Sequence, residues 1–175
     1  MKIIVLIFPL LLLSGCLEEP LIKAEDIIEE LPALKTFPDF EFLAHDNSTW
    51  NNSMFNGTPY IAYFSAAWCT HCESTLDAYD LAIPNDRFLV FNKDPTATYS
   101  NMTEWHENTE AGLNRTIDRP FMHAPNLSST MAVTDIPSAY FINSEGKIVD
   151  STIGLQTDVE ALKQLWNATV NWASQ

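Results

Sequence analysis

Alternating apolar and polar runs predict strands and helices in mixed order along the middle of the chain. The run Tyr60–Ser65 is continuously apolar, β-branched or aromatic, which is typical of a strand buried on both faces. Residues 73–81 follow with a helical pattern, and residues 87–91 are a second strand of the buried type. Strand, helix and strand within about 33 residues have the length of a βαβ unit. The pattern therefore predicts an α/β fold.

The flanking segments predict a hairpin on one side and a less regular region on the other. Residues 40–43 and Thr49–Asn51 enclose a polar turn, which is typical of a short β-hairpin. Residues 100–113 form a helical pattern with one apolar side, whereas residues 119–125 fit no regular period and are expected to be irregular.

Regular patterning returns in the C-terminal part. Residues 136–143 read as a strand that opens with a proline, and residues 147–153 pair back with it after a tight turn. Thr157 and Glu160 have the spacing of a capping box. We therefore expect Thr157 to be the N-cap of a helix that ends near residue 172.

The N-terminus has the features of an export signal. Lys2 is followed by an apolar stretch, residues 3–13, and by small residues before Cys16. This stretch is shorter than the ~20 residues that a transmembrane helix needs. Leu13-Ser14-Gly15-Cys16 resembles a lipobox, so residues 1–15 are interpreted as a lipoprotein signal peptide and Cys16 as the lipidated residue. A plain cleaved signal and an uncleaved anchor are the alternatives, and all three export the chain.

Charge defines the next segment and excludes one class of partner. Residues 16–36 are rich in Asp and Glu and are interpreted as an acidic tether, which leaves residues 37–175 as the folded domain. The whole chain of 175 residues has 23 acidic and 9 basic residues, a net charge of −14. Nucleic-acid binding depends on Lys and Arg that neutralise phosphates, so the excess of acidic residues excludes it. With 46% hydrophobic residues, the chain can still fill a core.

Asparagine acceptor triplets, Asn-X-Ser/Thr, occur at seven positions. They predict N-glycosylation of surface loops in an exported protein, although polar loops without glycans are the alternative. The seven candidates are Asn47, Asn51, Asn56, Asn101, Asn114, Asn126 and Asn167.

Cys69 and Cys72 lie where a buried strand leads into a helix. The unpaired N–H groups and the dipole at a helix N-terminus stabilise an anion, which lowers the pKa of a thiol. A thiol of pKa ~8.5 is about 3% thiolate at pH 7, and one of pKa ~7 is about half ionised. Cys72 is one turn further on the same face and within reach of a disulfide. Cys69 is therefore expected to attack and Cys72 to resolve the mixed disulfide.

The residues around this pair resemble the thioredoxin superfamily. The active-site stretch is Trp68-Cys69-Thr70-His71-Cys72, and Ile136-Pro137 resembles the cis-proline loop, which in that family holds the substrate segment. The resemblance implies a thioredoxin-like fold, a central mixed β-sheet flanked by helices. The N-terminal β-hairpin extension, the start Phe37-Pro38-Asp39-Phe40 and the lipobox are most similar to the membrane-anchored TlpA/ResA-type branch.

Two departures from the family pattern concern the chemistry of the pair. Tyr63 occupies the position at which many thioredoxins have a buried acid that accepts a proton. Thr70 and His71 separate the cysteines, and a protonated His71 can stabilise the Cys69 thiolate. Stabilising the reduced form makes a disulfide more oxidising, so Trp68, Thr70 and His71 are interpreted as tuning residues and the pair is expected in the oxidising half of the family range.

The expected function is that of an exported, lipid-anchored thiol–disulfide oxidoreductase. It would work through the Cys69–Cys72 disulfide without another cofactor or a metal, on the extracytoplasmic face of the membrane. Its partners would be envelope proteins with thiols or disulfides and a membrane redox partner.

Other uses of the same residues remain open. A zinc site, a structural disulfide and a copper carrier built on Cys69, Cys72 and a histidine are the alternatives for the pair. Copper-delivery relatives generally have CxxxC, which this chain lacks, and most of its other His and Met residues are expected to be core and loop residues. Pro137 could be a strand-edge proline.

Overall fold

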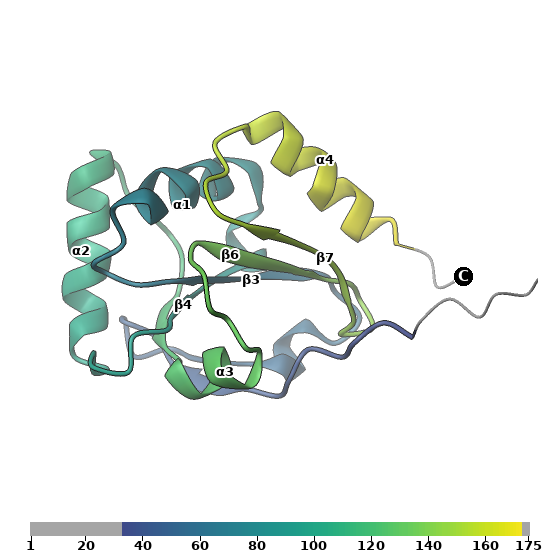
Figure 1. The fold of residues 1–175 in the computed structure, drawn as a ribbon, viewed down its shortest axis with the longest axis horizontal. Coiled ribbons are helices and arrows are strands. Elements are labelled where there is room, and N and C mark those ends of the chain that lie inside the picture. The colour runs from purple at the N-terminus through teal and green to yellow at the C-terminus, as the bar shows by residue number, and fades with distance from the viewer. Residues whose placement is uncertain (1–32, 173–175) are drawn as a thin grey trace, which may run out of the picture. The chain divides into compact units, whose positions relative to one another are not determined.

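The computed structural model describes residues 33–172, and a five-stranded mixed sheet forms its centre (Figure 1). The order of strands is β5-β4-β3-β6-β7. β3, β4 and β5 are parallel, whereas β6 pairs antiparallel with β3 on its other side and β7 pairs antiparallel with β6. The strands are β3 (Tyr60–Ser65), β4 (Phe88–Asn92), β5 (Phe121–His123), β6 (Ser138–Ile142) and β7 (Ile148–Ile153).

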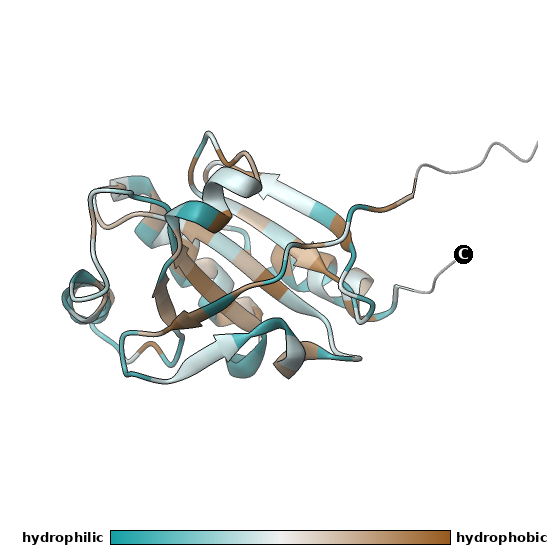
Figure 2. Cartoon of the chain, turned by 90° about the horizontal axis from the view of Figure 1, so that it is seen from below, coloured by the Kyte–Doolittle hydropathy of each residue, from teal (hydrophilic) through white to brown (hydrophobic). Residues whose placement is uncertain are grey.

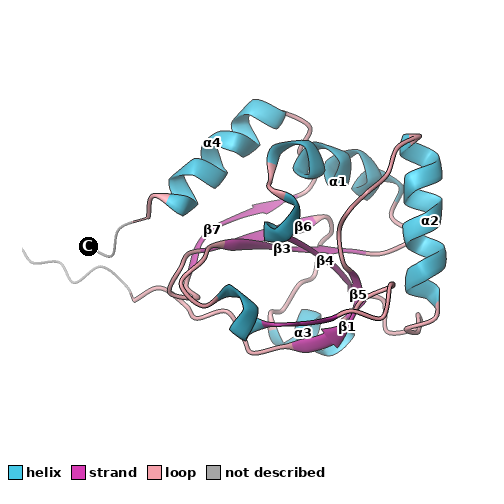
Figure 3. Ribbon diagram, turned by 180° about the vertical axis from the view of Figure 1, so that it is seen from behind, coloured by secondary structure: helices cyan, strands magenta, loops and turns pink. Residues whose placement is uncertain are grey.

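Helices cover both faces of this sheet. One face carries α1 (Thr70–Ala82), α2 (Asn101–Leu113) and α4 (Val159–Val170), which share a hydrophobic core. The other face carries α3 (Pro125–Thr130) and the hairpin of β1 (Glu41–Leu43) and β2 (Thr49–Asn51). Figure 3 shows β1 and α3 together on the side of the sheet opposite α1 and α4. Two short 3-10 helices, Asn52–Phe55 and Asn85–Arg87, precede β3 and β4.

The central strand β3 explains why the fold needs two cores. All six of its residues are buried, and successive side chains point to opposite faces. Ile61 and Tyr63 therefore pack under α1, whereas Tyr60, Ala62 and Phe64 pack toward the hairpin and α3. Figure 2 shows the hydrophobic residues gathered along the inner strands.

The mixed sheet, the flanking helices and the N-terminal hairpin confirm the expected fold class, but two local predictions are wrong. Residues 119–125 are not irregular, because Phe121–His123 forms β5 on the sheet edge and Pro125 begins α3. A strand of three residues is too short to show a period of two. The N-cap of α4 is Asp158 instead of Thr157, since the Asp158 carboxylate accepts a hydrogen bond from the N–H of Ala161 at 3.0 Å.

The expected tether is described only at its end. Ile148 donates its N–H to the carbonyl of Lys35 at 2.9 Å, and Thr36 forms a β-bridge with Lys147. The predicted signal peptide, Cys16 and the rest of the tether, up to residue 32, lie outside the described residues. Within residues 33–172, no helix is both long and apolar enough to cross a membrane.

Candidate active site

Cys69 and Cys72 form a disulfide at the N-terminus of α1. Their Cα atoms are 5.3 Å apart, and Cys69 is the N-cap of the helix. Cys69 is half-exposed, whereas only 2% of Cys72 is exposed. An attacking sulfur must be accessible, and the one that resolves the mixed disulfide need not be. The difference in exposure suits the roles expected for the two cysteines.

The position of Cys69 favours its thiolate once the disulfide is reduced. The first-turn N–H groups of a helix have no intrahelical partner, and no side chain caps α1. A thiolate at the N-cap can accept from these groups, which lowers the pKa of such a thiol. Thr70 and His71 lie in this first turn and are exposed, so both face solvent beside the disulfide.

Tyr63 lies directly beneath the resolving cysteine. Its hydroxyl donates a hydrogen bond to the backbone carbonyl of Cys72 at 2.8 Å, and its side chain is fully buried. Burial raises the pKa of Tyr63 well above its usual value. The hydroxyl therefore stays protonated and holds the first turn of α1 in place, but it is no substitute for the missing proton acceptor.

Trp68 is held beside the disulfide by a loop of the neighbouring strand. Its indole N–H donates to the Asp94 carboxylate at 2.9 Å, while 63% of the residue is exposed. Hydrogen bonds from Thr96 and Trp68 hold the pKa of Asp94 below its usual value. An ionised Asp94 thus fixes the indole, which is largely exposed and is not part of the core.

The proline predicted to form the cis loop lies at the same edge of the sheet. The Ile136–Pro137 peptide bond is cis, and Pro137 is buried while Ile136 is half-buried. Ser138 pairs with Phe64 in antiparallel register, so Pro137 comes next to the end of β3 that leads to Cys69. The Pro137 carbonyl accepts from the N–H of Gly154 at 2.8 Å, which ties this loop to the end of β7.

A small cavity of about 80 Å³ touches both sulfur-bearing residues, and Glu73 lines it. A Cβ on Gly112 of α2 would overlap with the Glu73 carboxylate, so glycine at this position leaves room for that side chain. Sequence reasoning did not single out Glu73 or Gly112. The position of Glu73 directly after Cys72 was the available signal, but its contact with α2 depends on the tertiary fold.

Five His and Met residues could supply copper ligands, and they are held in different parts of the fold: His106, His123, Met102, Met122 and Met131. Met102 and Met122 are buried in the cores on opposite faces of the sheet. His106 contacts the Ile117 carbonyl through Nε2 at 2.7 Å, and His123 contacts the Asp94 carbonyl through Nε2 at 3.1 Å. Within the described part of the chain, no three His, Cys, Asp or Glu residues form a group that could hold a metal ion.

The seven candidate glycosylation sites lie mostly on the surface. Asn51 is half-buried, and its side-chain carbonyl caps the 3-10 helix that follows β2. The other six are exposed: Asn47, Asn56, Asn101, Asn114, Asn126 and Asn167.

Comparison with known proteins finds similar chains among solved structures. No protein-family model and no curated protein sequence matches the chain. Among solved structures, the exposed lipoprotein thioredoxin Etrx1 from Streptococcus pneumoniae strain TIGR4 is similar, with a TM-score of 0.60 and 25% identity over 74% of this chain and 98% of that one.

Two further structures have the same fold. A putative thiol:disulfide interchange protein DsbE from Chlorobium tepidum has a TM-score of 0.60 and 20% identity over 78% of this chain and 96% of that one. StoA from Bacillus subtilis has a TM-score of 0.56 and 20% identity over 75% and 97%. With its strand order, its CxxC disulfide at a helix N-terminus and its cis-proline, the chain belongs to the thioredoxin-like superfamily.

Proposed function

We propose that this chain is a thiol–disulfide oxidoreductase of the cell envelope. The observation that carries the proposal is the Cys69–Cys72 disulfide at the N-terminus of α1, with one accessible and one buried cysteine and with the Pro137 loop beside it. The solved relatives include proteins described as thiol:disulfide interchange proteins, which supports the same chemistry here.

The exchange follows from the accessibility of the two sulfurs. In the reducing direction, the Cys69 thiolate attacks one sulfur of a partner disulfide, and the other partner sulfur leaves as a thiolate. Cys72 then attacks the Cys69 sulfur, closes the internal disulfide and releases the second partner thiolate. Two electrons pass from this chain to the partner. The reverse sequence oxidises a partner dithiol, and stabilisation of the Cys69 thiolate favours that direction.

The extracytoplasmic location and the lipid anchor are further parts of the proposal. The sequence Leu13-Ser14-Gly15-Cys16 supports them, as does the likeness to an exposed lipoprotein of 25% identity. When the full chain is produced in a bacterial host with a labelled fatty acid, we expect the label on the protein and its loss in Cys16→Ser. A wild-type chain that stays unlabelled and retains residues 1–15 would contradict the anchor.

Trapping tests the exchange chemistry directly. In the Cys72→Ser variant, Cys69 can still attack a partner disulfide, but the resulting mixed disulfide cannot be resolved, so we expect adducts with disulfide-containing envelope proteins to accumulate. Cys69→Ser is the matched control, and we expect far fewer adducts because Cys72 is 2% exposed. Equal trapping by the two variants would contradict the assignment of Cys69 as the attacking residue, and an absence of adducts in both would contradict the function.

A further inference from the structure

A second hollow continues from the cavity at the disulfide. It has a volume of about 320 Å³ and lies between Ala67, the end of β4 with the loop that follows it (residues 92–97) and the face of α2 that carries Glu104 and Asn108. We call it the α2 groove. Ala67, Trp105 and Asn108 line both the groove and the cavity that holds Cys69 and Cys72. A polypeptide bonded to Cys69 can therefore extend into the groove.

The groove contains a buried hydrogen-bond donor without a partner. Asn92 lines the groove and is 1% exposed. Its side-chain carbonyl accepts from the N–H of Asp94 at 2.8 Å, but its Nδ2 has no partner among the described residues. An unpaired buried N–H costs free energy, and such a group calls for an acceptor. A backbone carbonyl of a docked chain is an acceptor that every polypeptide has.

The charged residues of the groove all have the same sign. Asp94 and Glu104 line it, and none of its lining residues is Lys, Arg or His. Within residues 33–172, Glu104 has no ion pair at all. The neighbouring Lys93 does not neutralise the groove, because its ammonium donates at 2.8 Å to the carbonyls of Val133 and Thr134. Two carboxylates without a cation favour a positively charged occupant.

We propose that the α2 groove binds the segment of a redox partner that flanks the partner's reactive cysteine. This segment carries a Lys or Arg within about three residues of that cysteine, since an extended chain spans ~3.3–3.6 Å per residue. Glu104 and Asp94 pair with the basic side chain, and Asn92 Nδ2 donates to a backbone carbonyl of the segment. The inference rests on the proposed function, because it specifies which thiol or disulfide partners the same site selects.

Matched peptides test this preference. Each has one cysteine, activated as a mixed disulfide with 2-thiopyridine, and carries either Lys or Gln two residues before and two residues after that cysteine. The reduced full chain with Cys16→Ser attacks the peptide sulfur through Cys69 and releases pyridine-2-thione, whose absorbance gives the rate. Cys72 then closes the disulfide and frees the peptide thiol. At low ionic strength we expect the Lys peptide to react roughly tenfold faster than the Gln peptide.

Two variants separate the groove from the overall charge of the protein. Glu104→Gln should reduce the Lys preference several-fold, whereas Glu107→Gln removes the same charge from an exposed position that does not line the groove and should leave the preference unchanged. In the complex of Cys72→Ser with the Lys peptide, the NMR signals of the Asn92 side-chain amide should shift on binding.

The outcomes distinguish this inference from the proposed function. Equal rates for the two peptides, or equal effects of Glu104→Gln and Glu107→Gln, would overturn the groove assignment and leave the exchange chemistry intact. If the reduced chain reacts neither with the two peptides nor with the small molecule 2,2′-dipyridyl disulfide, the proposed function is overturned and the inference with it.

Discussion

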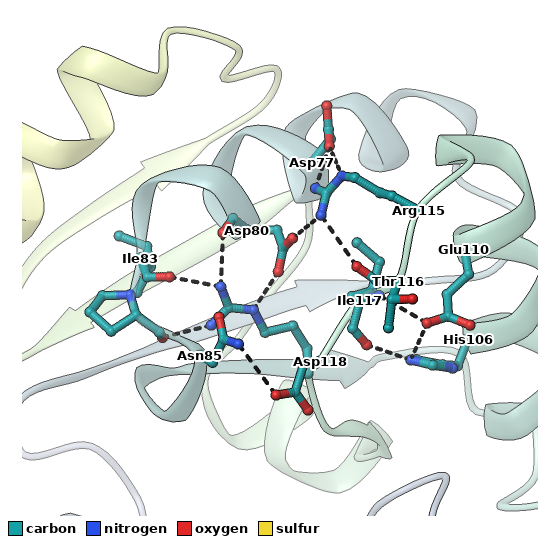
Figure 4. Close-up of polar contacts among 12 residues, drawn as sticks. Asp77, Asp80, Ile83, Asn85, His106, Glu110, Arg115, Thr116, Ile117 and Asp118 are labelled. Carbon is teal, nitrogen blue, oxygen red and sulfur yellow. Dashed lines mark hydrogen bonds and ion pairs between the residues drawn. The ribbon is translucent and has the colours of Figure 1, made fainter.

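Replacing Arg119 with methionine should destabilise the fold more than any change on the protein surface. The Arg119 side chain is fully buried between α1 and β5, and it forms an ion pair with the Asp80 carboxylate. The same guanidinium donates to the carbonyls of Asp80, Ile83 and Pro84 at 2.8, 2.7 and 2.6 Å (Figure 4). These carbonyls end α1 and begin the loop after it, where backbone acceptors lack helical partners.

The magnitude follows from what methionine cannot replace. Methionine fills a similar volume, so the loss of stability comes mainly from the missing ion pair and hydrogen bonds. Removing one partner of a buried ion pair costs about 3–5 kcal/mol. Asp80 keeps an ion pair with Arg115, which places the expected loss within that range and not above it. Domains have total stabilities of about 5–15 kcal/mol, so Arg119→Met should leave a folded but weakened protein.

Urea unfolding of the oxidised chain measures this loss. With a slope of ~1–3 kcal/mol per molar urea, the midpoint should fall by about 2 M without a change in slope. Arg87→Met is the control, because among the described residues the ion pair of the Arg87 side chain is with the adjacent, exposed Asp86 at 3.2 Å, and such a pair contributes at most about 1 kcal/mol. A loss below about 1 kcal/mol for Arg119→Met, or equal losses for the two variants, would refute the role given to Arg119.

Three further changes test other parts of the structure. Burial and the stacked ring of His106, 3.8 Å away between centroids, lower the pKa of His45. Below pH ~6.5 the unfolded chain therefore binds a proton at His45 more readily than the folded chain does. The free energy of unfolding should fall as the pH drops from 7.5 to 5, and it should fall less steeply in His45→Gln. Urea midpoints measured across this pH range check the difference. Gly112→Ala should raise stability by about 0.5–1 kcal/mol, because the flexible Glu73 side chain can move away from the new methyl group; a loss in urea unfolding would contradict this. Asp158→Ala should cost about 1 kcal/mol of thermal stability through loss of the α4 N-cap, and an unchanged melting temperature would argue against that cap.

Much of the fold could be predicted because its central elements are long or strongly patterned. The continuous apolar run of β3 is long enough to indicate a buried strand, and the apolar side of α2 has enough residues to show the period of a helix. β5 could not be predicted, since its three residues become a strand only by pairing with β4. The N-cap of α4 was misplaced by one residue because Thr157 and Asp158 are both good caps, and it is the Asp158 carboxylate that accepts from the N–H of Ala161.

The candidate site shows the same division between local and tertiary information. The cysteines and Pro137 could be singled out as candidates because each lies next to a strand with a clear pattern. The α2 groove was not found, because Asn92 and Glu104 lie on different elements and meet only in the folded chain. The orphaned amide of Asn92 has no sequence signature of its own.

The reduction potential of the Cys69–Cys72 pair tests the central claim most directly. Equilibration of the full chain with glutathione buffers, read by alkylation of the free thiols, gives the potential. A pair that exchanges disulfides should equilibrate reversibly between about −270 and −120 mV, and the position of Cys69 at the N-terminus of α1 favours the upper half of that range. A potential below about −300 mV is typical of a structural disulfide and would contradict the account.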